Sequence, residues 1–213
     1  MNADAAKPGG RFITFEGGEG AGKSTQARLL VDALKRAGID ALATREPGGS
    51  PGAEAIRTLL LGGGPDAWDA ETEALLVVAA RRDHVVRVIR PALESGRWVV
   101  CDRFADSTLA YQGFGHGLSL EHLRELHRFV CQGFHPDLTL ILDLPVEVGL
   151  KRASDRNRFE RMGRDFHERM RQGFLAIAQH APERCVLIDA TGDIESVRRA
   201  VVASVRDRLG VGL

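Results

Sequence analysis

The chain has 213 residues, of which 44% are hydrophobic, and this is enough for one domain with a substantial core. Its 29 basic and 29 acidic side chains cancel, so no overall field would attract nucleic acid or an anionic membrane. No apolar run approaches the ~20 residues of a membrane-spanning helix. The composition therefore favours a protein that acts on small molecules, without nucleic-acid or membrane partners.

The cysteines favour a cytoplasmic protein. Cys101, Cys131 and Cys185 are odd in number, far apart and set in apolar runs, which is typical of reduced core thiols rather than of disulfides or a zinc site. Residues 1–10 lack the apolar core of a signal peptide, and we expect them to form a disordered tail. The remaining chain, 11–213, is expected to be a single domain.

A glycine-rich stretch is the most informative part of the chain. An apolar run over 12–16 leads into residues 17–24, which match the phosphate-binding pattern G-x-x-x-x-G-K-[ST], and an amphipathic helix follows. Backbone N–H groups of such a loop point at phosphate oxygens, Lys23 adds a cation, and the Ser24 hydroxyl can bind Mg²⁺. We expect a nucleoside triphosphate to be bound by Gly17, Gly18, Glu19, Gly20, Ala21, Gly22, Lys23, Ser24 and Thr25.

Strand-like runs alternate with helical ones along the whole chain, which predicts an α/β fold with a parallel sheet covered on both faces. Ligands of such sheets bind beyond the carboxyl ends of the strands. The strands are expected near 12–16, 40–45, 97–101, 138–143 and 185–189. The helices are expected near 22–37, 52–61, 70–94, 119–133, 146–154, 164–180 and 194–208.

Three of these strands end in an aspartate that could organise Mg²⁺. Periodicity cannot choose among Asp102, Asp143 and Asp189, but their neighbours favour Asp102. The other two resemble caps of the helices that follow. Asp102 is followed by Arg103 and by polar and aromatic side chains spaced like one face of a helix, namely Ser107, Thr108, Tyr111 and Gln112.

Arginines near other strand and helix ends have two possible roles. Arg45 stands in the turn after the second strand, where it could clamp an anion or lie in solvent, and the residues alone favour neither. In the apolar helix 70–94, either Arg81 or Arg82 reads a substrate, or they pair with neighbouring acids. His84 is interpreted as an ordinary histidine at the surface or with a protein partner.

The segment 152–171 alternates arginines with acids. It is either a solvated helix pair with weak ion pairs or a lid that closes guanidinium groups over a triphosphate. Asn157 and Gly163 break the helical register, which favours a short lid near 154–163.

In order and spacing, these motifs resemble the thymidylate kinases, which are P-loop nucleoside monophosphate kinases, over residues 11 to about 209. The resemblance implies a five-stranded parallel sheet sandwiched by helices, transfer of the γ-phosphoryl group of ATP to dTMP with Mg²⁺, and a homodimer. The motifs are the P-loop with an acid at its third position, Thr-Arg-Glu-Pro-Gly-Gly at 44–49, Ala-Ala-Arg at 79–81, Asp-Arg at 102–103, Ser107 with Tyr-Gln-Gly at 111–113, and Ile-Asp-Ala-Thr at 188–191.

The resemblance also assigns roles to individual residues. It implies that Glu19 holds the deoxyribose 3′-hydroxyl, that Tyr111 excludes a 2′-hydroxyl, and that the peptide bond before Pro47 is cis. Lys23, Asp102 and Arg103 are the expected catalytic residues, and Ser24 with Asp102 the expected Mg²⁺ ligands. The expected acceptor site comprises Arg45 and Arg103 at the phosphate, Arg81 and Thr108 at the thymine edge, and Glu19, Ser107, Tyr111 and Gln112.

The chain departs from the family pattern at the thymine-stacking position, in the lid and in the P-loop. The lid is short, because residues 160–163 read Glu-Arg-Met-Gly where bacterial relatives often continue Asp-Arg-Ile-Glu with more acidic residues. The aromatic residue that stacks on thymine in many relatives is replaced by Val77 or Val78, so stacking would be weaker or come from Phe104. The P-loop also has Gly20 where some relatives carry an arginine. We therefore expect a lid arginine to stabilise the transferring phosphoryl group, with Arg161 as the first candidate and Arg156 as the second.

Two other functions remain as alternatives. The first is a related kinase for another deoxynucleotide or for a nucleoside, which differs only in the acceptor pocket. The second is a nucleotide-binding switch without kinase activity. A guanine-selecting Asn-Lys-x-Asp motif is missing from the sequence, and this speaks against the switch.

Overall fold

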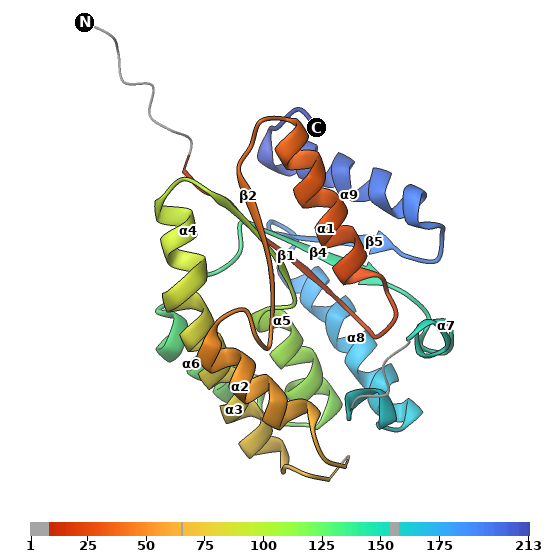
Figure 1. Ribbon diagram of the computed structural model, residues 1–213. Helices are drawn as coiled ribbons and strands as arrows, with labels where there is room; N and C mark the ends of the chain where they lie inside the picture. The colour runs from red at the N-terminus through yellow and green to blue at the C-terminus, as the bar shows by residue number, and fades with distance from the viewer. Residues whose placement is uncertain (1–8, 65, 154–157) are drawn as a thin grey trace, which may run out of the picture.

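Five parallel strands form the centre of the protein. The structure is a computed structural model, and it describes residues 9–64, 66–153 and 158–213. The sheet has the order β2-β3-β1-β4-β5 (Figure 1), which confirms the predicted α/β class and strand number. The predicted tail over 1–10 therefore lies almost wholly outside the described residues. The strands are β1 (Phe12–Gly17), β2 (Ala41–Arg45), β3 (Trp98–Asp102), β4 (Leu138–Asp143) and β5 (Cys185–Asp189).

The strand sequences reflect their positions in the sheet. All six residues of the central strand β1 are buried, because helices cover both faces, and this explains its continuous apolar run. Along β1, Ile13 and Phe15 face one core cluster and Phe12 faces another. The edge strand β2 instead alternates buried or half-buried residues with exposed ones. Each strand lies within one residue of its predicted range.

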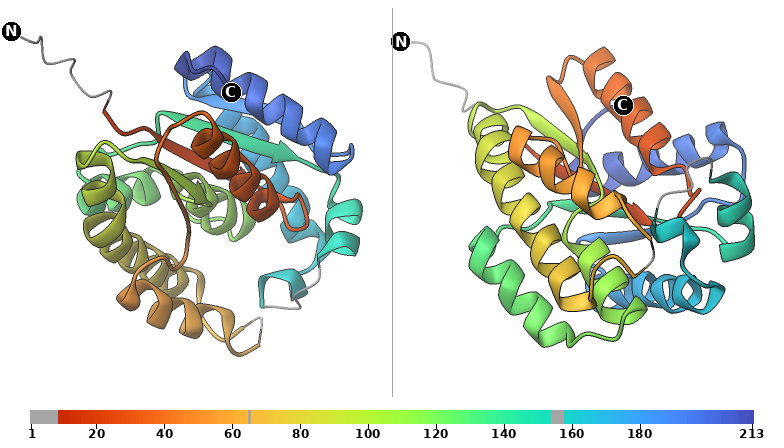
Figure 2. Two further views of the ribbon diagram at one scale, coloured as in Figure 1. Left: turned by 45° about the horizontal axis from the view of Figure 1, so that its top comes forward. Right: turned by 60° about the horizontal axis from the view of Figure 1, so that its bottom comes forward.

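Helices on both faces complete the three layers. Figure 2 shows α1 and α9 together on one side of the sheet and α8 on the other, in agreement with the core clusters. Among described residues the helices are α1 (Lys23–Arg36), α2 (Pro51–Leu61), α3 (Ala70–His84), η1 (Val85–Ile89), α4 (Arg90–Glu94), α5 (Ala105–Thr108), η2 (Leu109–Gly115), α6 (Leu120–Cys131), α7 (Val146–Arg152), η3 (Phe159–Arg161), α8 (Arg164–His180) and α9 (Ile194–Leu209).

Two helical segments differ from the expectation. The helix predicted over 70–94 contains a π-helical stretch, η1, directly before Pro91, whose missing N–H cannot join the regular helical ladder. The segment α5–η2 has no counterpart in the predicted elements, although the spacing of its polar side chains indicated a helical face. Gly113 and Gly115 obscure it in the sequence, and they allow the close packing of this helix against Leu120 and Phe166, whose side chains would have to shift to admit a Cβ.

The remaining expectations concern cysteines and membranes. Cys101, Cys131 and Cys185 are all buried and free, as their apolar settings predicted. In the ranges that the structure describes, no helix combines the length and the apolar character needed to cross a membrane.

Candidate active site

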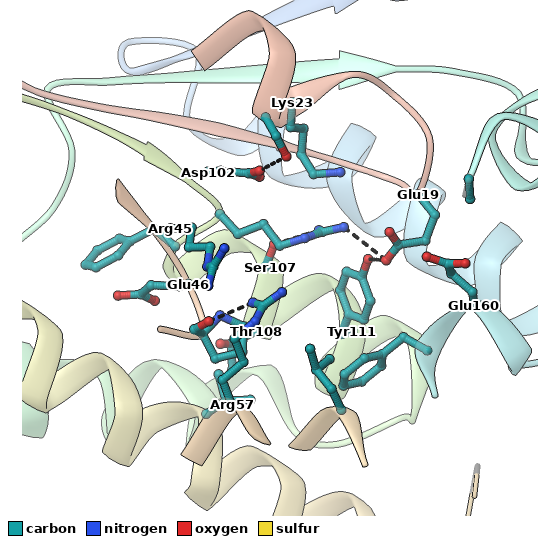
Figure 3. A pocket seen from close by; sticks show the side chains of 18 of the residues that line it. Glu19, Lys23, Arg45, Glu46, Arg57, Asp102, Ser107, Thr108, Tyr111 and Glu160 are labelled. Atoms are coloured by element: carbon teal, nitrogen blue, oxygen red, sulfur yellow. Dashed lines mark hydrogen bonds and ion pairs between the residues drawn. The ribbon is translucent and has the colours of Figure 1, made fainter. Parts of the chain in front are cut away.

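A cavity of about 500 Å³ opens at the carboxyl ends of β1, β2 and β3 (Figure 3). Its wall is built from the P-loop, the turn after β2, helices α2 and α3, the loop after β3 and η2. The site therefore lies where a parallel sheet is expected to bind ligands. The sequence-predicted residues that line it are Glu19, Gly20, Gly22, Lys23, Ser24, Thr25, Arg45, Arg81, Asp102, Arg103, Ser107, Thr108, Tyr111 and Gln112.

Lys23 lies at the floor of the P-loop. Its Nζ donates to the carbonyl oxygen of Gly18 at 2.6 Å, and the side chain is buried. Burial, reinforced by the charge of Arg103, lowers the pKa of Lys23 to about 8. A triphosphate beside the ammonium group would raise this pKa again, so anion binding and protonation of Lys23 favour each other.

Backbone packing holds the P-loop against α7. Gly20 has φ +67°, and a Cβ on it would overlap the carbonyl oxygen of Gly149. A Cβ on Gly149 would in turn overlap the carbonyl oxygen of Glu19. In this arrangement a side chain at position 20 has no room.

Asp102 has the surroundings expected of a Mg²⁺ ligand. Ser24 donates its hydroxyl to Asp102 Oδ2, while Asp102 Oδ1 is buried and finds no hydrogen-bond partner in the described part of the chain. Carboxylate and hydroxyl oxygens are ligands that Mg²⁺ prefers, and the remaining ligands would be phosphate oxygens and water. The described residues contain no cluster of three or more acidic, histidine or cysteine side chains for a metal, so a protein-only cage is not formed there.

The two other strand-end aspartates have different partners. Asp143 forms a two-pronged ion pair with Arg171, at 2.7 and 2.9 Å, and Asp189 accepts from the Thr191 backbone at 2.9 Å. The sequence suggested that each caps the following helix, and this prediction is wrong for both. Helix α7 begins after Pro145, and Asp193 is the N-cap of α9.

Arg103 joins the P-loop to the acceptor side. Its guanidinium donates to the Gly17 carbonyl at 3.0 Å and to Glu19 at 3.0 Å, and lies 4.9 Å from the Tyr111 ring centroid. Tyr111 also donates to Glu19, at 2.5 Å (Figure 3). The left-handed backbone of Arg103 (φ +71°) costs about 1 kcal/mol or more, which these contacts offset.

Glu19 is ionised despite its burial. Burial by itself would raise the pKa of this carboxyl group, but the charges of Arg103 and Lys23 lower it to about 2. Glu19 lines the cavity and its side chain is 17% exposed, so this carboxylate between two cationic side chains can accept a hydrogen bond from a ligand hydroxyl group. It also keeps the two cations from repelling each other.

The sequence analysis missed a second buried acid, Glu16, at the end of β1. One of its oxygens accepts from the Phe104 backbone at 2.8 Å and the other from the Ser107 hydroxyl at 2.5 Å. Burial, reinforced by Asp106, raises the pKa of Glu16 to about 8. Glu16 therefore anchors the loop that carries Arg103, and an acid inside an otherwise apolar strand was the available signal.

Arg81, and not Arg82, faces the cavity. It is 1% exposed and donates to Glu46 at 2.7 Å, to Thr108 at 2.9 Å and to the Phe104 carbonyl at 3.1 Å. Arg82 donates to the Val130 carbonyl away from the site. Neither arginine forms the pair with Asp83 or Glu73 that the sequence left open, because Asp83 pairs with Arg87 and Glu73 with Arg158.

The end of β2 and helix α2 bring one arginine each to the opposite wall. Arg45 is half exposed and contacts Glu54 at 3.1 Å. Arg57 of α2 also lines the cavity and donates to the Pro47 carbonyl at 2.7 Å. Arg57 was not among the residues predicted from the sequence. The Glu46–Pro47 peptide bond is cis, as the resemblance implied.

The candidates for base stacking occupy different places. Val77 lines the cavity, whereas Val78 is buried in the core. Phe104 borders the cavity, but its ring is 1% exposed, packs edge-on against Phe12 and lies under the guanidinium of Arg81, 5.2 Å away. Val77 is therefore the side chain at this position with access to a ligand, and it offers the base an apolar contact without aromatic stacking.

The described lid arginines point in several directions. Arg158 is fully buried and pairs with Glu73, which also accepts from Gln112 at 2.6 Å. Arg161 donates to the Gly63 carbonyl at 3.2 Å and is not among the residues that line the cavity, while Arg152 is. Arg156 lies outside the described residues.

Comparisons with known proteins agree with this geometry. A family model described as thymidylate kinase matches residues 15–201. The chain is 58% identical to a thymidylate kinase of Caulobacter vibrioides over 205 residues, which cover 95% of this chain and 99% of the relative. It is 51% identical to one of Rhizorhabdus wittichii, with coverages of 94% and 99%.

A solved structure is similar over nearly the same length. The crystal structure of thymidylate kinase from Ehrlichia chaffeensis superposes with a TM-score of 0.79 at 35% identity, and the match covers 93% of this chain and all of that one. The chain therefore belongs to the thymidylate kinase family, whose members use ATP to phosphorylate dTMP to dTDP.

Proposed function

We propose that the chain carries out this reaction with a donor half and an acceptor half of one cavity. The observation that supports the division most strongly is the meeting of Lys23, Asp102 and Arg103 at the boundary between the P-loop and the loop after β3. ATP binds along the P-loop, and dTMP binds against the turn after β2, helix α3 and η2. Arg103 then stands between the two phosphate groups.

The donor half holds the triphosphate by backbone N–H groups and Lys23. We propose that Ser24 and Asp102 hold Mg²⁺, which neutralises phosphate charge when it is bound. Lys23 stabilises the negative charge that shifts toward the bridging oxygen as the bond to the γ-phosphoryl group breaks. This contact strengthens in the transition state and should therefore act on kcat.

The acceptor half needs no strong general base. The second pKa of a phosphate monoester is ~6, so the attacking oxygen of dTMP is already anionic at neutral pH. The task of the protein is to bring two repelling anions together and to align them. We assign this task to Arg45 and Arg103, with Arg57 as a third cation on the same wall.

Arg81 is proposed to read the base. Three of its N–H groups bind Glu46, Thr108 and the Phe104 carbonyl, while Nη1 is buried and has no hydrogen-bond partner among the described residues. A group with only donors requires an acceptor on the ligand, such as the C4 carbonyl of thymine. Ser107 and Gln112 support this wall through Glu16 and Glu73.

The sugar is proposed to lie between Glu19 and Tyr111. The ionised Glu19 would accept a hydrogen bond from the 3′-hydroxyl, and the Tyr111 ring would occupy the space of a 2′-hydroxyl. The Tyr111 ring is fixed by edge contacts with Phe159, at 5.6 Å, and Phe166, at 6.0 Å. Exclusion by a fixed ring is steric and does not depend on charge.

We further propose that a lid arginine from the same subunit stabilises the transferring phosphoryl group, with Arg161 first and Arg156 second. Gly20 supplies no cation at the P-loop, and the overlap with Gly149 leaves no room for one. An additional guanidinium can contribute ~10³–10⁵ in kcat to phosphoryl transfer. Arg161 must leave its Gly63 contact to reach the phosphates, so this role implies that residues 158–163 move toward them. The rest of the predicted lid, 154–157, lies outside the described residues.

A homodimer in the cytoplasm is the proposed assembly and location. Three large apolar side chains are exposed on α3, η1 and α6, namely Leu75 (56%), Val86 (42%) and Phe129 (83%), and α3 contacts α6. Such a group of apolar side chains is typical of an interface. The free buried cysteines support a reducing compartment. Light scattering, which measures the molar mass in solution, tests this interface. The Phe129→Glu variant should be a monomer under conditions where the original protein is a dimer.

A coupled ADP-release assay tests the function directly. Initial rates with dTMP, dUMP, dCMP and thymidine, each with ATP and Mg²⁺, should give the highest kcat/KM for dTMP. Omitting Mg²⁺ should abolish transfer. A higher kcat/KM for thymidine or dCMP would assign the acceptor pocket to another kinase reaction.

A further inference from the structure

A row of polar side chains lies behind Arg81, of which Glu46 and His84 are buried and Thr44 is half-buried. Thr44 Oγ1 lies 2.7 Å from His84 Nε2, and His84 Nδ1 lies 3.1 Å from Glu46 Oε1. The other oxygen of Glu46 accepts from Arg81 Nε at 2.7 Å. The row thus links strand β2 to the arginine that faces the base, through both oxygens of one carboxylate.

His84 has no other evident task. It is 0% exposed, and neither His84 nor Thr44 is among the residues that line the cavity. Gly49 closes the space beside the imidazole ring, because a Cβ on Gly49 would overlap His84 Nε2. The ring is therefore confined to one orientation, and it can transmit that orientation to Glu46.

The orientation of Glu46 matters for the ligand. A carboxylate bound only to Arg81 could rotate and allow the guanidinium to turn, which would move Nη1 away from the base. Because His84 holds the second carboxylate oxygen, the Glu46–Arg81 pair keeps one geometry before the ligand arrives. Such preorganisation favours binding of a matching ligand.

We propose that His84, through Glu46, is a positioning residue that sets the selectivity for an acceptor base with a carbonyl at C4. This proposal rests on the role of Arg81 as the reader of the base, proposed above. A base with a 4-amino group presents a donor to the Nη1 donors of Arg81, and only a fixed guanidinium can reject it fully. His84 would thus control base discrimination without touching the nucleotide.

The test uses kcat and KM for dTMP and dCMP, and KM for ATP, in three variants. His84→Leu removes both hydrogen bonds while keeping a similar side-chain volume. We expect the KM for dTMP to rise about 10-fold and the preference for dTMP over dCMP to fall about 10-fold. The KM for ATP should stay unchanged. His84→Asn keeps a donor near the place of Nδ1 and should restore most of both. Thr44→Val removes only the hydrogen bond between Thr44 and His84. It should change the KM for dTMP and the preference for dTMP over dCMP in the same direction as His84→Leu, but by a smaller factor.

His127→Leu is the matched control. His127 is also buried, donates from Nε2 to the Phe134 carbonyl at 3.1 Å and packs against Phe104, but it makes no hydrogen bond with Glu46. We expect a lower Tm with unchanged KM and unchanged selectivity. The proposal is overturned if His84→Leu behaves like this control, or if His84→Asn restores Tm but not selectivity.

Arg81→Gln separates the two levels of the argument. If this variant keeps the preference for dTMP over dCMP, the proposed role of Arg81 itself fails. If Arg81→Gln loses the preference but His84→Leu and Thr44→Val keep it, only the positioning role of His84 fails.

Discussion

The donor and acceptor halves of the cavity are held together by different kinds of contact. On the donor half, the P-loop rests on α7 through two glycines, Gly20 and Gly149, whose backbones touch. On the acceptor half, three carboxylates each fix an arginine or its loop, namely the buried Glu16 and Glu46 and the half-buried Glu19. Donor recognition therefore depends on backbone shape, whereas acceptor recognition depends on a few side-chain pairs that single substitutions can remove.

This comparison predicts where losses will appear in the kinetics. Cations that act on the transferring phosphoryl group should affect kcat, because their contacts strengthen in the transition state. Residues that hold the acceptor should affect KM or selectivity.

The largest expected effect is that of the lid arginine. Arg161→Ala should lower kcat by ~10³-fold with little change in the KM for dTMP. Steady-state rates with saturating ATP measure this. Arg164→Ala is the control, since Arg164 is exposed and pairs with Glu147. If single and paired alanine changes at 156 and 161 leave kcat within a few-fold, the lid arginines do not act on the transferring phosphoryl group, and Arg158 is left with its buried ion pair to Glu73.

Lys23→Ala should lower kcat by at least ~10²-fold, because the ammonium group stabilises charge that develops between the phosphates. Circular dichroism should show an unchanged fold. Lys35→Ala, in the last turn of the same helix, is the matched control. A Lys23→Ala variant with more than a tenth of the original kcat would contradict the role given to the P-loop.

Glu19→Gln should raise the KM for dTMP about 10-fold, since a charged acceptor of the 3′-hydroxyl is replaced by a neutral one. A dTMP analogue without the 3′-hydroxyl sharpens the test. The variant and the original protein should use that analogue almost equally well. An equal penalty on both acceptors would mean that Glu19 acts through Arg103 rather than on the sugar.

Tyr111→Ala should increase relative activity on acceptors with a 2′-hydroxyl, because the ring no longer fills that space. The ratio of kcat/KM values for the ribo and deoxy acceptors is the measurement, since loss of the Tyr111 packing will also lower stability. Tyr111→Phe, which keeps the ring, should leave the ratio unchanged. If the ratio does not rise in the alanine variant, another residue excludes the ribose.

The smallest expected effect is on the pH dependence of stability. The pKa of Glu16 is raised from 4.5 to about 8 in the fold, so the unfolded chain loses this proton first as the pH rises. The stability contributed by protonated Glu16 is complete below pH 4.5 and is lost between pH 4.5 and about 8.

Glu16→Gln mimics the protonated acid and removes this loss. The Tm of the variant relative to the original protein should rise by a few °C, on the order of 2–4 °C for each kcal/mol, between pH 5 and pH 9. A constant Tm difference across this range would show that Glu16 is ionised in the fold.

The sequence predicted the fold well because strong patterns specify it. The buried strands are continuous apolar runs, and the P-loop motif stands between a strand and a helix, where its chemistry requires it. The helical segment α5–η2 was harder to predict, because the glycines at 113 and 115 lower its helix propensity. Its helical form depends on tertiary packing against Leu120 and Phe166, which the local sequence does not show.

The candidate site was predictable only where residues lie next to a motif. Asp102, Arg103, Ser107 and Tyr111 follow one strand and were found together. The choice between Arg81 and Arg82 could not be made, because it depends on Glu46, 35 residues away in the sequence. Glu16 and Arg57 were missed for a similar reason, since their partners are set by the packing of separate segments.

The contact between Gly20 and Gly149 restricts how such an enzyme can evolve. A side chain at position 20 would begin where the carbonyl oxygen of Gly149 lies, so an arginine cannot enter the P-loop unless α7 shifts as well. A cation moved from the lid to the P-loop therefore requires coordinated changes in two segments that are about 130 residues apart in the chain. Each change alone would be harmful, and this epistasis would keep the location of the charge constant within a lineage.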